Sequence, residues 1–195
     1  MSIDLYSKLN WKDIRHLIIY HCAPLLAGLK ISNLLVIDEN DYKKACEFLE
    51  GTSIEMYILS RKDGKIALLL YDRRKLSEYI NESQNKLFMI QMGYSNCCVD
   101  KVLYELSVRY SSYQNGYGIF PHELGIVLGY PLVDVYGFMA NDGEKYILNG
   151  YWKVYGQETK ARETFRAYDE ATQLLVTLFV ERSNLERLTM LGLAS

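Results

Sequence analysis

The chain has 195 residues, of which 49% are hydrophobic and 24% are charged, and it contains only 3 prolines. This composition excludes a disordered, collagen-like or disulfide-scaffold protein and predicts a soluble, globular chain with one substantial core. The formal net charge is −2, so no general basic field is present to hold nucleic acid or anionic lipid. We therefore expect neither nucleic acid nor a membrane as a partner.

The cellular compartment is inferred from the N-terminus and the cysteines. Residues 1–10 mix Asp4 and Lys8 with apolar residues, whereas a secretion signal joins a basic segment to an apolar run. The longest apolar stretches, such as residues 66–71, are far shorter than the roughly 20 residues that cross a bilayer. The four cysteines form no CxxC pair. We expect a cytoplasmic protein with reduced thiols.

The first predicted helix covers residues 11–20, because Ile14, Leu17 and Ile18 recur at helical spacing. One further turn reaches His21, which we therefore expect on the buried side. Pro24 lacks an N–H and its ring clashes with the preceding turn, so a break is predicted near Cys22, with a restart at Pro24. Cys22 would then lie at the N-terminal end of the second helix.

A hairpin is the clearest element of the next segment. Residues 34–37 predict a short strand, and a helix follows up to residue 50. Residues 54–60 and 65–71 then flank a turn that contains Asp63 and Gly64, and Asp-Gly supplies the positive φ angles of a tight hairpin. Residues 66–71 are apolar on both faces, which predicts an interior strand covered by helices on both sides.

The remaining elements are mostly helical. Residues 146–155 have the aromatic and β-branched content of a strand, which we expect to join the sheet of the hairpin. From Glu158 onward one apolar stripe predicts a long C-terminal helix that packs on the body or on a partner. The chain thus reads as a single α+β domain over residues 1–195. The other predicted helices cover residues 73–80, 85–92, 98–113, 121–128 and 132–139.

Four segments of the chain carry a family resemblance: residues 21–30, 70–76, 120–138 and 150–155. Together they resemble domain-of-unknown-function family 3793, over roughly residues 11–170. The resemblance implies a cytoplasmic protein of anaerobic Gram-positive bacteria, and it implies no activity. The sequence leaves the cofactor unknown. The third segment is long enough to be specific.

A thiol-dependent enzyme is one hypothesis for the function. A helix that began near Pro24 would direct its N–H groups toward Cys22 and lower the pKa of the thiol. His122 could then act as the general base, and Glu123 could orient His122. The alternative interpretation is a buried small thiol and a histidine in the core or at a helix end.

Metal and DNA binding are weaker hypotheses. His21, Cys22, His122 and Glu123 are acceptable ligand types for zinc or iron, but their spacing does not match a metal motif, so no metal site is predicted. Residues 124–138 match the spacing of a helix-turn-helix. The would-be recognition helix contains no Arg or Lys, however, so we expect a helical hairpin packed in the core.

A ligand site is the favoured hypothesis. Lysine and arginine side chains such as Lys30, Arg73 and Lys153 could line a pocket for an anionic ligand, and aromatic rings such as that of Trp152 could stack on a planar ligand. The alternative interpretation is that the charged residues lie on the surface and the aromatic residues fill the core. We expect a ligand-binding or regulatory domain for an anionic or planar small molecule. The alternatives are the Cys22–His122 enzyme and a structural or protein-interaction module, in which the C-terminal helix would hold a second copy or another protein. The candidate ligand residues are His21, Lys30, Arg73, Arg74, Trp152 and Lys153.

Overall fold

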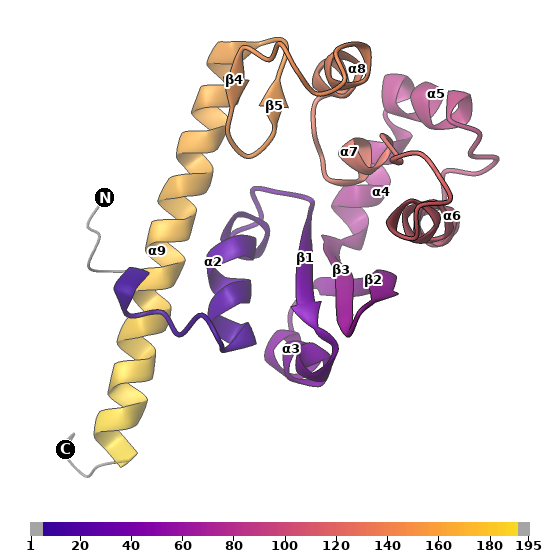
Figure 1. Ribbon diagram of the computed structural model, residues 1–195. Helices are drawn as coiled ribbons and strands as arrows, with labels where there is room; N and C mark the ends of the chain where they lie inside the picture. Colours follow the sequence, from indigo (N-terminus) through magenta and orange to yellow (C-terminus); the bar gives the residue numbers. More distant parts are fainter. Residues whose placement is uncertain (1–5, 191–195) are drawn as a thin grey trace.

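The computed structural model describes residues 6–190, and the side chains of residues 6–182. It confirms an α+β fold, with a three-stranded antiparallel sheet that has helices on both faces (Figure 1). The elements are α2 (Ile14–Leu26), β1 (Ser32–Asp38), η1 (Glu39–Asp41), α3 (Tyr42–Leu49), β2 (Ile54–Lys62), β3 (Lys65–Asp72), α4 (Arg73–Asn81), α5 (Ser83–Gln91), α6 (Val99–Gln114), α7 (Leu124–Val127), α8 (Leu132–Ala140), β4 (Leu148–Asn149), β5 (Lys153–Val154) and α9 (Glu158–Met190).

The predicted hairpin is confirmed. Strands β2 and β3 pair antiparallel, with Lys62 opposite Lys65 across a two-residue turn. Asp63 and Gly64 have φ angles of 50° and 73°. These angles match the left-handed conformation that both central residues of such a turn require.

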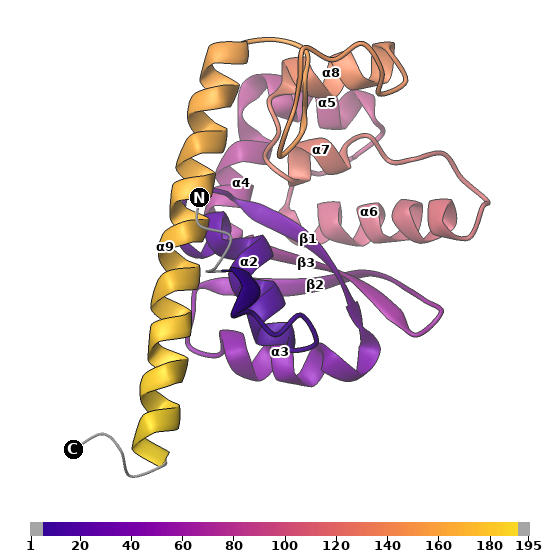
Figure 2. The same cartoon turned by 60° about the vertical axis from the view of Figure 1, so that its left-hand side comes forward.

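Strand β3 is the central strand, in the order β1-β3-β2, as its two apolar faces predict. Its alternate residues belong to two separate cores, because successive side chains of a strand point to opposite faces. Ile66, Leu68 and Leu70 pack with the core that contains residues of α2 and α3. Ala67, Leu69 and Tyr71 pack with the core that contains residues of α4, α5, α6 and α7. Figure 2 shows these two groups of helices on either side of the sheet.

The predicted break near Cys22 is wrong. Helix α2 continues through Pro24 to Leu26, so Cys22 lies inside the helix. Proline removes one helical hydrogen bond, and burial of the flanking Ala23 and Leu25 against the core offsets that loss. The expected burial of His21 is also wrong: its side chain is exposed. The buried row of α2 instead runs through Ile14, Ile18, Cys22 and Leu25.

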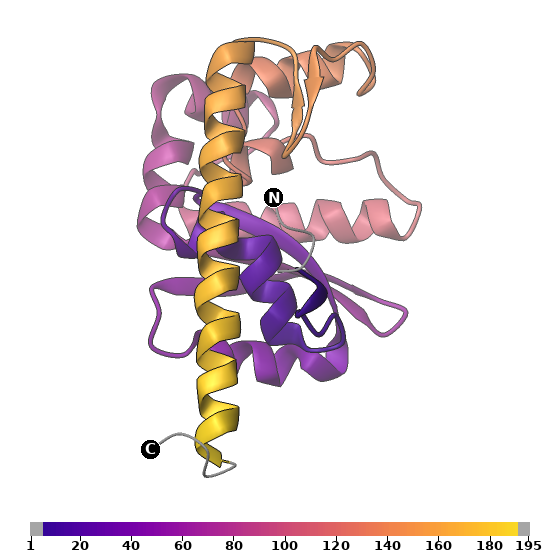
Figure 3. The ribbon, with the colours of Figure 1, turned by 90° about the vertical axis from the view of Figure 1, so that its left-hand side faces the viewer.

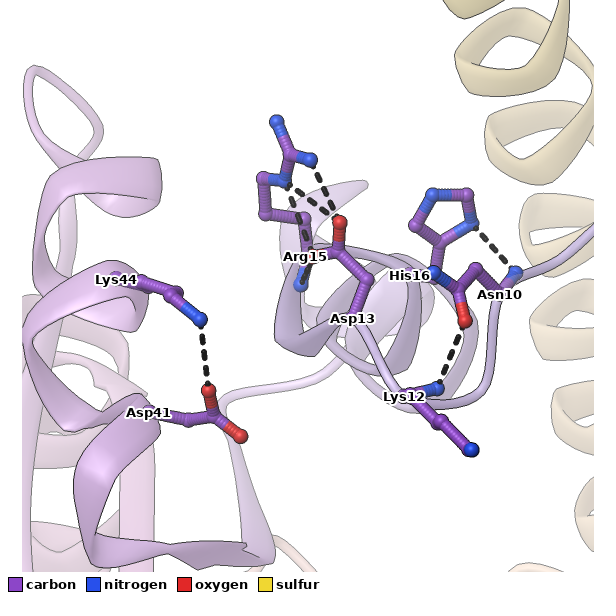
Figure 4. A network of polar contacts seen from close by, with 7 residues as sticks. All are labelled: Asn10, Lys12, Asp13, Arg15, His16, Asp41 and Lys44. Carbon is purple, nitrogen blue, oxygen red and sulfur yellow. Dashed lines mark hydrogen bonds and ion pairs between the residues drawn. The ribbon is translucent and has the colours of Figure 1, made fainter.

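Local polar contacts hold the start of α2 (Figure 4). The Asp13 carboxylate caps the helix, because Oδ1 accepts the backbone N–H of Arg15 at 3.0 Å. The backbone N–H of Asn10 lies 3.2 Å from Nδ1 of His16. These contacts fix the direction in which the chain enters the helix.

The prediction of one strand over residues 146–155 is wrong. The segment folds back on itself as a separate two-stranded sheet, β4 and β5, with Leu148 opposite Val154. Gly150 lies at the turn, and a Cβ atom there would overlap with the ring of Phe165 in α9. The segment therefore bends where glycine allows close packing on α9, and it does not extend the main sheet.

Helix α9 runs along one side of the molecule (Figure 3). Its first turns cover the small hairpin, where Ala161 and Tyr168 pack with Trp152 and Val154. Further along, Val176 and Val180 pack with residues of α2. The outer face of α9 leaves Leu174 and Leu178 exposed. Within residues 6–190, no helix combines the length and the apolarity needed to cross a bilayer.

Candidate functional site

A cavity of about 290 Å³ lies between α7, α8 and the β4–β5 hairpin. Three of the residues predicted from the sequence line it: His122, Trp152 and Lys153. His122 lies on a different segment of the chain from the adjacent Trp152 and Lys153, so only the fold brings it to them. The walls are otherwise mainly apolar, and they include Phe120, Leu124, Leu128, Tyr130, Val135 and Phe138.

Glu123 does not orient His122 through a hydrogen bond. The Glu123 side chain is buried, and Oε1 accepts hydrogen bonds from the Tyr94 hydroxyl at 3.1 Å and from Nη1 of Arg109 at 2.9 Å. Burial and the nearby carboxylate raise the pKa of Tyr94, so its hydroxyl remains a donor. This anchored group fixes the backbone that precedes α7.

His122 occupies the cavity wall between two aromatic rings. Its ring centroid lies 5.5 Å from that of Phe120 and 5.8 Å from that of Phe138. Its Nδ1 atom is buried and has no hydrogen-bond partner among the described residues. Buried polar atoms are nearly always paired in folded proteins, so this nitrogen has a hydrogen-bonding capacity that the described residues leave unused.

Trp152 is held by a residue that sequence reasoning missed. Its Nε1–H donates to Oδ2 of Asp134 at 2.7 Å. The other carboxylate oxygen of Asp134 accepts the backbone N–H groups of Tyr155 at 2.7 Å and Gly156 at 3.0 Å. Asp134 thus joins α8 to the segment around β5. The signal that could have identified Asp134 is a lone acid in the first turn of an otherwise apolar helix.

The Trp152 indole forms an inner wall of the cavity. It stacks on Tyr130, with ring centroids 5.5 Å apart and an angle of 27° between the planes. The Phe165 ring meets it edge-on at 4.5 Å. Because its N–H and its ring are both constrained, Trp152 presents a fixed aromatic surface.

Lys153 supplies the positive charge of the cavity lining. Its Nζ donates to the backbone oxygen of Gly143 at 2.6 Å and lies 4.9 Å from the Tyr146 ring centroid and 5.9 Å from that of Phe138. Within residues 6–182, no carboxylate forms an ion pair with it. The ammonium group therefore keeps donor capacity for an anion.

Lys30 lies behind the cavity wall and does not line it. Its side chain is buried, and Nζ donates to Oδ1 of Asn33 at 2.6 Å. Nζ also lies 5.8 Å from the ring centroid of Tyr130, which is itself a cavity residue. Burial lowers the pKa of Lys30 to about 8. Its recorded contact with a cavity residue is therefore the one with Tyr130.

Cys22 is separated from His122 by the sheet. It belongs to the core formed with α2 and α3, whereas α7 packs on the opposite face. Burial raises the pKa of the Cys22 thiol to about 12, and its Sγ lies 3.5 Å from Nδ2 of Asn33. The expected helix N-terminus at this thiol does not exist, because Cys22 is inside α2. Cys22, His122 and Glu123 share no hydrogen bond among those the structure records.

The other predicted ligand residues lie on the surface. Arg73 forms ion pairs with Glu55 and Asp100, both at 2.8 Å, and Arg74 pairs with Glu78 at 2.8 Å. Neither arginine lines the cavity, and His21 does not line it either. Across the part of the chain that the structure describes, no three His, Cys, Asp or Glu residues gather as metal ligands would.

A comparison with models of protein families agrees with the resemblance found in the sequence, whereas two other comparisons give no match. No curated protein and no solved structure matches the chain. One family model matches residues 18–189, which include α7, α8, the small hairpin and almost all of α9. The chain therefore belongs to the family described as "Protein of unknown function (DUF3793)".

Proposed function

We propose that the protein is a ligand-binding domain and that it holds a small planar molecule in the cavity beside α7 and α8. The observation that carries the proposal is the arrangement of His122, Trp152 and Lys153 around one aromatic space. Small-molecule sites are typically concave and mainly apolar, with a few polar groups that fix the orientation of the ligand. In support of the proposal, the cavity lining is mainly apolar and includes the polar residues His122, Asp134 and Lys153.

The two alternative functions have less support. A thiol-dependent enzyme needs a base within hydrogen-bond reach of the nucleophile, and Cys22 packs on the face of the sheet opposite to α7. An interaction role through α9 is supported by the exposure of Leu174 and Leu178. Single exposed leucines are common on protein surfaces, so ligand binding remains the better supported function.

A fluorescence experiment tests the proposal, because the chain has 2 tryptophans in different settings. Trp11 is 48% exposed, whereas Trp152 is 9% exposed and lines the cavity. The Trp11→Phe variant leaves Trp152 as the only indole, and the Trp152→Phe variant leaves Trp11. The probe is 4-nitrobenzyl alcohol, a neutral planar quencher.

We expect saturable quenching with one site per chain in the Trp11→Phe variant. The matched Trp152→Phe variant should show only the linear quenching of random collisions. Circular dichroism checks that both variants are folded. Linear quenching in the Trp11→Phe variant would refute a planar-ligand site at this cavity.

A further inference from the structure

We infer that the ligand is an aromatic acid of one or two rings whose acid group binds Lys153 and whose second polar group binds His122. This inference rests on the proposed function, and it goes further because it assigns a partner to each polar group of the ligand. The evidence is the unused hydrogen-bonding capacity of these two side chains.

Lys153 is the better placed of the two for an acid group. An ammonium group has three donors, and the structure records one of them in use, toward Gly143. The rings of Phe138 and Tyr146 lie beside the charge, with centroids 5.9 Å and 4.9 Å from Nζ. A carboxylate that reaches Lys153 forms a charge-assisted hydrogen bond, which is stronger than a neutral one.

Asp134 is the acidic residue of the cavity lining, and it does not compete for Lys153. Its two oxygens already accept three N–H groups, from Trp152, Tyr155 and Gly156. These donors disperse the negative charge toward the hairpin. An incoming carboxylate therefore meets an available cation, together with an acid whose charge is already stabilised by three hydrogen bonds.

His122 provides the second point of recognition. Its Nδ1 is buried without a protein partner, and a turn of the ring toward the cavity would let a ring hydroxyl or ring N–H of a ligand satisfy it. His122 and Lys153 both lie within 6 Å of the Phe138 ring centroid. Both residues also line the same cavity, so a single planar molecule bound there is placed between the two recognition groups.

The size of the cavity limits the ligand. Its volume of about 290 Å³ lies just below the range for ligand pockets, about 300–1,000 Å³. This space suits one or two rings and is too small for a dinucleotide. The walls contain no second lysine and no arginine that could receive a chain of phosphates.

Isothermal titration calorimetry with a matched set of ligands tests the inference. The probes are 4-hydroxybenzoate, which has both groups, 4-hydroxybenzamide, which lacks the charge, and benzoate, which lacks the hydroxyl. The variants are Lys153→Met and His122→Phe, which keep side chains of similar shape. Lys12→Met serves as the control, because Lys12 is exposed and lies outside the cavity.

In the wild-type protein we expect 4-hydroxybenzoate to bind about tenfold more tightly than 4-hydroxybenzamide, as a hydrogen bond to a charged group predicts. Lys153→Met should abolish that preference, and His122→Phe should abolish the preference for 4-hydroxybenzoate over benzoate. Lys12→Met should change neither. Equal affinities of the acid and the amide, or a preference that survives Lys153→Met, would overturn the inference.

The two proposals fail in different ways. If 4-nitrobenzyl alcohol saturates the quenching of Trp152 and the acids bind no better than the amide, the cavity binds planar molecules and the acid assignment is wrong. If no planar probe binds, the proposed function itself is wrong. Circular dichroism of the Lys153→Met and His122→Phe variants distinguishes a lost contact from a lost fold.

Discussion

Asp134 is a buried carboxylate whose two oxygens accept three N–H groups. Replacing it with alanine would leave the Trp152 indole N–H and two backbone N–H groups without acceptors. Each unsatisfied buried donor costs about 1–3 kcal/mol. We therefore expect Asp134→Ala to lower the free energy of unfolding by about 3 kcal/mol or more in urea denaturation. The control Glu163→Ala, at an exposed position of α9, should change it by less than about 0.5 kcal/mol.

The lowered pKa of Lys30 leads us to predict how the free energy of unfolding depends on pH. Burial lowers its pKa from 10.5 to about 8, so between these values the unfolded chain binds more protons than the folded chain. The free energy of unfolding should therefore rise with pH in this range, by about 1 kcal/mol between pH 8 and 9. The neighbouring Cys22 acts in the opposite direction above pH 9, because its pKa is raised from 9.0 to about 12.

The Lys30→Met variant isolates this contribution. Urea denaturation of both proteins at pH 7, 8 and 9 should show the wild type gaining stability relative to the variant. The exposed Lys12→Met should follow the wild type at every pH. Parallel curves for the wild type and Lys30→Met would show that Lys30 has no lowered pKa in the folded chain.

At the scale of elements, the sequence was most informative where local rules act alone. The Asp63–Gly64 turn predicts the hairpin, and the two apolar faces of β3 predict that this strand is central in the sheet. The structure confirms both. Helix α2 continues through Pro24 because it packs against the sheet. Rules that use only neighbouring residues in the sequence do not describe such packing. The same is true of the turn at Gly150, which exists because α9 packs closely there.

The candidate site was predictable only in part, for a related reason. His122, Trp152 and Lys153 belong to residue types that bind ligands, so sequence reasoning could select them. Their convergence depends on how the β4–β5 hairpin folds against α7 and α8. Arg73 was chosen as a candidate for the same reason as Lys153. The sequence alone does not show that Arg73 forms surface ion pairs with Glu55 and Asp100 instead of lining the cavity.

Gly137 provides a prediction for helix α8. In an exposed helix, replacing glycine with alanine stabilises a protein by about 1 kcal/mol. A Cβ at residue 137 would overlap with Cβ and Cγ of Tyr155, and overpacking costs about 1–3 kcal/mol. We expect Gly137→Ala to lower the free energy of unfolding, measured in urea, by about 1–2 kcal/mol. The exposed Gln173→Ala control in α9 should be neutral, and a Gly137→Ala variant as stable as the wild type would contradict the close packing.

At the scale of the whole molecule, the cavity lies outside the main sheet. The two large cores share β3, whereas Trp152 and Val154 belong to a separate small cluster with residues of α9. Strands β4 and β5 have only 2 residues each. The cavity wall is therefore built on an element with few backbone hydrogen bonds, which is typical of the less stable regions that bind ligands.

Hydrogen exchange followed by mass spectrometry tests this division of stability. Amides of β3 should exchange slowest, because this strand is paired on both edges and buried on both faces. Amides of residues 148–156 should exchange faster, because local opening of the small hairpin leaves the sheet intact. Saturating 4-hydroxybenzoate should slow exchange in residues 120–128 and 148–156 and leave β3 unchanged. Equal protection of the hairpin and β3 in the free protein would show that the cavity wall opens only when the whole chain unfolds.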